Sequence, residues 1–199
     1  MNGVRAVVIG ASAGGVAALF KVLGGLPAGF VTPVLCVLHL PGDRHSQLAE
    51  VLQRRLRRPV REVCDKEPIA PGLIYVAGPG YHVSVEHDLT FSLSQEDPVH
   101  FSRPAIDFLF TSAADAYGAG LLGVLLTGAN EDGAAGLAYI HQSGGRTVVQ
   151  DPRDAQVPLM PEAALALHRP DLILTLSGIE QLLSTLESSA CQAPPSPNC

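Results

Sequence analysis

Short, continuous apolar runs alternate with amphipathic segments along most of the chain. Such runs are typical of strands that are buried on both faces of a sheet. We predict strands at residues 4–9, 32–38, 60–64, 121–126, 147–149 and 172–174. Apolar positions at helical spacing predict helices at 15–23, 45–56, 104–117, 134–143, 160–168 and 179–186. This alternation predicts an α/β fold with a doubly wound, mostly parallel sheet and helices on both faces.

The pattern changes between Leu73 and Leu93. Apolar residues there occur in short alternating pieces at 74–77, 82–85 and 90–93, which glycine, proline and aspartate separate. Alternation of this kind predicts an antiparallel hairpin that is added beside the parallel sheet.

Composition sets the size of the core. The chain has 199 residues, of which 47% are hydrophobic, and this is sufficient for a core that is covered on both faces. We predict one folded domain at residues 1–187. The turn-forming composition of residues 188–199 predicts a disordered tail.

Net charge and cysteine spacing indicate which partners and which cellular compartment to expect. The formal net charge is −6, which argues against a nucleic-acid partner because phosphate binding requires a concentrated basic surface. A basic stretch from Arg54 to Arg58 lies at the end of a predicted helix, where cations are favourable, so we interpret it as a solvated helix end. The four cysteines lack C-x-x-C spacing, and no apolar span reaches membrane length. We expect a cytoplasmic protein without membrane insertion.

The first predicted strand leads directly into Gly10-Ala11-Ser12-Ala13-Gly14. This Gly-x-Ser-x-Gly pattern predicts a tight turn with the serine hydroxyl at its crest. His39 and Asp132 also follow predicted strands, so all three side chains should emerge at one edge of the parallel sheet. A nucleophile, a base and an orienting acid can meet there, which predicts a serine hydrolase.

Other interpretations compete at the same residues. His45 is the second choice for the base, and Glu131 is the neighbouring competitor of Asp132. Ser12 and Asp132 each precede a predicted helix, so each could instead be an N-cap. The glycine-rich turns could also bind an anion or nucleotide, but the chain lacks both G-x-G-x-x-G and Gly-Lys-Ser/Thr. The order serine, histidine, acid differs from that of α/β-hydrolases.

The same residues belong to a longer collinear set. The sequence resembles the catalytic domain of the CheB family, which comprises protein-glutamate methylesterases that are also protein-glutamine glutaminases. The matching segments are 9–15, 39–41, 69–72, 103–110, 125–128, 132–136 and 160–163. Collinearity over nearly the whole chain is far more specific than any one motif.

The resemblance implies a role for each member of the predicted triad. Ser12 corresponds to the family's nucleophile, His39 to its base and Asp132 to its orienting acid. It also implies hydrolysis of glutamate γ-methyl esters on the cytoplasmic helices of chemoreceptors, with no metal ion and no organic cofactor.

The resemblance extends to the surroundings of the triad. Ala129 stands where the family has a methionine whose N–H binds the oxyanion, and Ala13 replaces a threonine beside the nucleophile. Arg44 and Arg103 are candidates for contacting the acidic receptor surface.

The family usually carries a receiver domain ahead of this unit. Here the first predicted strand begins at Val4, so we expect no covalently attached receiver. Two alternatives remain open: an ester or amide hydrolase with another substrate, and a non-catalytic module that binds a receptor or signalling partner.

Overall fold

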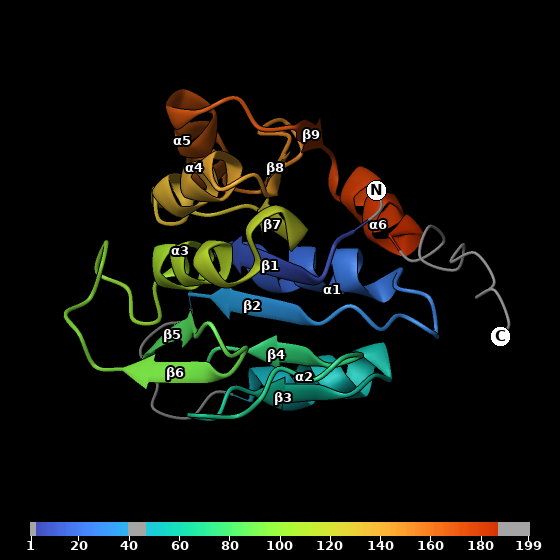
Figure 1. Ribbon diagram of the computed structural model, residues 1–199. Coiled ribbons are helices and arrows are strands. Elements are labelled where there is room, and N and C mark those ends of the chain that lie inside the picture. The colour runs from blue at the N-terminus through green and yellow to red at the C-terminus, as the bar shows by residue number, and fades with distance from the viewer. Residues whose placement is uncertain (1–2, 40–46, 187–199) are drawn as a thin grey trace, which may run out of the picture.

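A seven-stranded parallel sheet forms the centre of the protein, with the strand order β3-β4-β2-β1-β7-β8-β9 (Figure 1). The computed structural model describes residues 3–39 and 47–186. The sheet strands are β1 (Ala6–Ala11), β2 (Val34–Leu38), β3 (Val60–Glu62), β4 (Ile74–Val76), β7 (Leu121–Leu125), β8 (Arg146–Gln150) and β9 (Leu172–Leu174). The helices are α1 (Gly15–Gly24), α2 (Leu48–Leu56), α3 (Ile106–Tyr117), a short 3₁₀ turn η1 (Gly118–Gly120), α4 (Ala134–Gln142), α5 (Leu159–Leu167) and α6 (Leu176–Thr185).

Helices cover both faces of the sheet. Alternate residues of β1 illustrate this: Val7 and Ile9 belong to a core cluster with residues of α1, α2 and α6, whereas Ala6 and Val8 belong to a cluster with residues of α3, α4 and α5. Every residue of β1, β2 and β7 is buried, which explains why these strands appear in the sequence as continuous apolar runs. The predicted doubly wound α/β architecture is confirmed.

The strand order changes direction at β1, which pairs with β2 on one side and β7 on the other. Main-chain hydrogen bonds continue past the ends of these strands, from His39 N–H to Ala11 C=O (3.1 Å) and from Ser12 N–H to Thr127 C=O (2.9 Å). The segments that follow the three strands are therefore held side by side. Crevices at such switch points are the usual ligand sites of open α/β sheets.

The predicted hairpin is correct for two of its three pieces. Strands β5 (His82–Val85) and β6 (Phe91–Ser94) form a separate antiparallel pair that packs on α3. The first piece is a correction, because Ile74–Val76 is β4 and pairs in parallel with both β2 and β3. All its residues are buried, as befits a strand with a neighbour on each side.

The start of helix α3 differs from the predicted start at Pro104. Helix α3 begins at Ile106, with Ala105 as its N-cap, two residues after Pro104.

Cys36 is buried, and burial raises the pKa of its thiol to about 12, whereas Cys64 is exposed beyond β3. No helix of the described residues combines the length and hydropathy needed to cross a membrane. The predicted tail at 188–199 lies outside the described residues.

Candidate active site

Ser12 lies in the tight turn between β1 and α1. The N-cap of α1 is Gly14, which adopts a left-handed conformation at φ 80° that suits glycine. No side chain caps this helix end, and the turn is closed instead by a hydrogen bond from Gly15 N–H to Ser12 C=O (2.8 Å). The Ser12 hydroxyl is therefore not used as a helix cap, which removes the competing interpretation of this residue.

His39 and Asp132 form a close pair at the carboxyl edge of the sheet. His39 follows β2 directly, and its Nε2 atom lies 2.8 Å from Oδ2 of Asp132. The Asp132 side chain is fully buried and that of His39 is 10% exposed. Sequence-distant residues 39 and 132 are thus brought together as predicted.

Asp132 caps a helix, although not the helix that follows it. The N-cap of α4 is Gly133, again left-handed at φ 89°, and it has no side-chain cap. The Asp132 carboxylate instead accepts hydrogen bonds from the N–H groups of Ile106 (2.6 Å) and Asp107 (3.1 Å), in the first turn of α3. The positive end of the α3 dipole and these N–H groups offset the cost of burying the charge.

A second carboxyl group at the start of α3, that of Asp107, is partly buried. Its Oδ1 atom accepts a hydrogen bond from Gly136 N–H (2.6 Å), which joins α3 to α4. Burial raises the pKa of the Asp107 carboxyl; the hydrogen bond from Gly136 lowers it, and the nearby charge of Asp132 raises it further. More hydrogen bonds therefore offset the burial of the Asp132 carboxyl than offset the burial of the Asp107 carboxyl.

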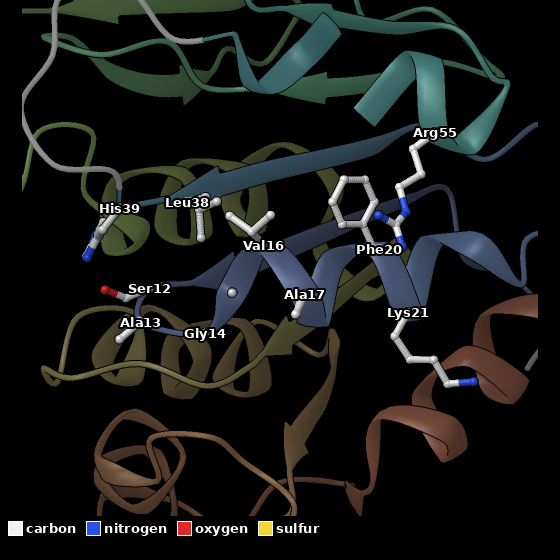
Figure 2. Close-up of a pocket in the computed structure, with 11 residues that line it drawn as sticks. Ser12, Ala13, Gly14, Val16, Ala17, Phe20, Lys21, Leu38, His39 and Arg55 are labelled. Carbon is white, nitrogen blue, oxygen red and sulfur yellow. The ribbon is translucent and has the colours of Figure 1, made fainter. Parts of the chain in front are cut away.

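The hydrogen bond to Asp132 sets the tautomer of His39. An ionised carboxylate can only accept, so Nε2 carries the proton and Nδ1 presents a lone pair. Ser12 and His39 line the same end of one groove, where the Ser12 hydroxyl and the His39 ring lie at the sheet edge (Figure 2). Nδ1 is therefore the atom that can take the Ser12 proton. It has a hydrogen-bond partner in this structure, Ser102 Oγ at 3.3 Å.

The Thr127 side chain joins the Ser12 turn to a neighbouring loop. The buried Thr127 hydroxyl bonds to the carbonyl groups of Ala13 (2.9 Å) and Val157 (3.2 Å), and so ties three loops together. Among the hydrogen bonds of the described residues, none uses the N–H of Ala13 or of Ala129. The Ala13 N–H follows Ser12 directly in the chain, and the Ala129 N–H lies two residues beyond Thr127, whose carbonyl accepts from Ser12 N–H.

Two sequence-level competitors are placed elsewhere. Glu131 points to solvent with a 69% exposed side chain, and its Oε1 atom lies 3.4 Å from Nδ1 of His100. His45, the second choice for the base, lies outside the described residues.

The structure describes one of the two candidate receptor-contacting arginines. The Arg103 guanidinium donates to the carbonyl groups of Gln95 (3.1 Å) and Glu96 (3.0 Å), in the segment that follows β6. Its Nε atom is buried without a partner among the described residues. Arg44 lies outside them.

Sequence reasoning missed three residues that support the site. Ser102 directly precedes the Arg103-Pro104 motif, and Thr127 lies in the matched segment 125–128, so position in these motifs was the available signal. Gln150, at the end of β8, is fully buried and accepts from Thr127 N–H (2.9 Å). An apolar strand gives no sign that its last residue will support a loop of another strand.

A parallel α/β sheet with a serine, a histidine and a buried carboxylate at one edge is typical of serine hydrolases. Comparison with known proteins makes this class specific. The family model described as CheB methylesterase matches residues 7–183. The chain therefore belongs to the CheB methylesterase family, and it is a hydrolase.

Individual relatives agree with this assignment. A protein of Leptospira interrogans, strain Fiocruz L1-130, whose name provisionally gives it protein-glutamate methylesterase/protein-glutamine glutaminase activity, is 42% identical over 93% of this chain and 96% of its own. An enzyme of that name from Methanospirillum hungatei is 40% identical over 83% of this chain, which spans 47% of the relative. The crystal structure of the Thermotoga maritima CheB methylesterase catalytic domain matches with a TM-score of 0.85 at 30% identity, over 91% of this chain and 97% of that one.

Proposed function

We propose that Ser12, His39 and Asp132 hydrolyse γ-methyl esters of glutamate side chains on chemoreceptors. The observation that carries this proposal is the buried Asp132–His39 pair, 2.8 Å apart, which leaves Nδ1 of His39 as an acceptor at the Ser12 end of the groove. The names of the relatives support the ester and the protein substrate.

The first half-reaction forms an acyl-enzyme. His39 Nδ1 takes the proton of Ser12, and the Ser12 Oγ atom attacks the γ-carbonyl carbon of the ester. The N–H groups of Ala13 and Ala129 hold the negative oxygen of the tetrahedral intermediate. The Nδ1–H group then protonates the leaving methoxide, and methanol departs. Asp132 stabilises the imidazolium that exists between these two proton transfers.

The second half-reaction restores the enzyme. His39 Nδ1 takes a proton from a water molecule, which attacks the acyl-enzyme carbonyl. The intermediate collapses, Ser12 regains its proton and a glutamate side chain is released. The same steps with ammonia as the leaving group convert glutamine to glutamate, which the relatives' second activity name supports.

The test is release of methanol from chemoreceptors that carry radiolabelled methyl esters. The protein should release labelled methanol, and the Ser12→Ala variant should not. Release from small aryl esters alone, with none from receptors, would instead favour an esterase with another substrate. No turnover of any ester would favour a module that only binds.

A further inference from the structure

A groove of about 810 Å³ begins at Ser12 and His39 and follows the exposed side of α1 (Figure 2). Val16, Ala17 and Phe20 line it from α1, and Leu38 faces them from the end of β2. Its far end is formed by Lys21 and by Arg55, which reaches over from α2. One glutamyl ester side chain would fill only the Ser12 end of so long a groove.

Charge divides the groove into two parts. The stretch beside Ser12 is apolar, with Val16 40% exposed to solvent. The far end carries two cations, and none of the described residues that line the groove is a carboxylate. Since the whole chain has a formal net charge of −6, this positive end is a local feature rather than a general property of the surface.

Of these two cations, Arg55 is the one without an ion-pair partner in the part of the chain that the structure describes. The Lys21 ammonium lies 2.6 Å from Glu180 Oε2, so its charge is already paired. The Arg55 guanidinium lies over the Phe20 ring, 4.6 Å from its centre. None of the ion pairs found within residues 3–39 and 47–186 involves Arg55. Stacking on an aromatic ring orients a guanidinium and leaves its N–H edge available for a carboxylate.

We propose that this groove binds the polypeptide segment that carries the ester, and that Arg55 recognises an acidic side chain of that segment. The inference rests on the proposed function, because it needs a protein substrate. An α-helix rises about 1.5 Å per residue, so Phe20 lies about 8 Å beyond Gly15 along α1. Ser12 precedes Gly15 by three further residues, so a helical substrate lying along the groove would place a carboxylate at Arg55 when this side chain is about one and a half to two turns from the ester.

The experiment uses synthetic helical peptides with one glutamate γ-methyl ester and a glutamate seven residues before or after it. Matched peptides carry lysine in place of that glutamate. Dissociation constants are measured by fluorescence anisotropy with the Ser12→Ala variant, which keeps the ester intact. The charge is then reversed at Arg55 by Arg55→Glu, with Arg54→Glu as the control, since Arg54 is also exposed on α2 but does not line the groove.

We expect at least one glutamate peptide to bind more tightly than its lysine counterpart. Arg55→Glu should raise the dissociation constant of that peptide about fivefold, whereas Arg54→Glu should change the dissociation constant less than twofold. Arg55→Lys should retain part of the affinity. Equal effects of the two glutamate variants, or no preference for the glutamate peptides, would overturn the proposal. Thermal melting of each variant verifies that it is folded.

Methanol release by the parent protein separates this proposal from the proposed function. If Arg55 controls peptide binding but the parent releases no methanol, the groove proposal is supported and the esterase assignment is wrong. If methanol is released at the same KM by the parent and by Arg55→Glu, the esterase assignment stands and the groove proposal fails.

Discussion

The Ser102 hydroxyl lies 3.3 Å from Nδ1 of His39, the nitrogen that the proposed mechanism needs for Ser12. Ser102 is held by its backbone, because Val99 and Ser102 exchange main-chain hydrogen bonds of 3.1 and 2.8 Å across a two-residue turn. The Ser102 hydroxyl also has a second acceptor, the carbonyl of His100 at 3.4 Å. It can therefore release Nδ1 without losing every hydrogen-bond partner.

We expect Ser102→Ala to raise kcat. The resting hydrogen bond to Nδ1 competes with Ser12, and one neutral hydrogen bond of about 1 kcal/mol corresponds to a gain of up to about fivefold. Steady-state hydrolysis of a small ester measures this change without involving the Arg55 end of the groove. A loss of more than a hundredfold would contradict this competition and would show that the Ser102 hydroxyl supports catalysis.

Asp132→Asn should lower kcat by about 10⁴ while the fold is retained. An amide has only one accepting oxygen for the N–H groups of Ile106 and Asp107, which bind different oxygens of the carboxylate, and it cannot stabilise an imidazolium or select the required tautomer of His39. Rates with the small ester and the melting temperature should be measured together. A loss of both in parallel would indicate a purely structural role for Asp132.

Ala129→Pro tests the oxyanion site directly. Proline removes the main-chain N–H of this exposed loop residue, and loss of one such donor should lower kcat by about 10² to 10³. Ala129→Gly keeps the N–H and is the matched control, for which we expect a change of less than tenfold. Equal losses in both variants would mean that the loop's conformation matters, and not its donor.

Asp107→Asn should stabilise the protein at neutral pH. The pKa of Asp107 is raised in the folded state, chiefly by burial, so its ionised form is favoured more in the unfolded chain. Its contribution to stability is therefore present below the unfolded pKa and is lost as pH rises through the folded one. Asparagine keeps an oxygen for Gly136 N–H but carries no charge.

Melting temperatures of this pair at pH 7 and in mild acid verify the sign. The advantage of Asp107→Asn should shrink as the pH falls and the parent carboxyl becomes protonated. Asp107→Ala serves as the control and should be destabilising, because it leaves Gly136 N–H without its acceptor. An advantage that grows in acid would contradict the direction of the pKa shift.

The sequence predicts the features that depend on local patterns, and it misses those that depend on contacts between distant parts of the chain. Buried parallel strands such as β1 and β7 appear as unbroken apolar runs, and their carboxyl ends share one edge, so the His39–Asp132 pair and the position of Ser12 at the same edge could be predicted. The assignment of Ile74–Val76 could not, because a three-residue strand carries no sign of its partners. Asp132 was a plausible cap for α4, and only the tertiary fold shows that it caps α3 instead.

The most direct test of the account is where a serine-directed fluorophosphonate reacts. Such a probe forms a stable adduct with the serine that the catalytic base activates. Peptide mapping by mass spectrometry should place the adduct on Ser12, and it should persist in Ser102→Ala but disappear in His39→Ala. An adduct on Ser102, or unchanged labelling after His39→Ala, would contradict the central claim that His39 activates Ser12.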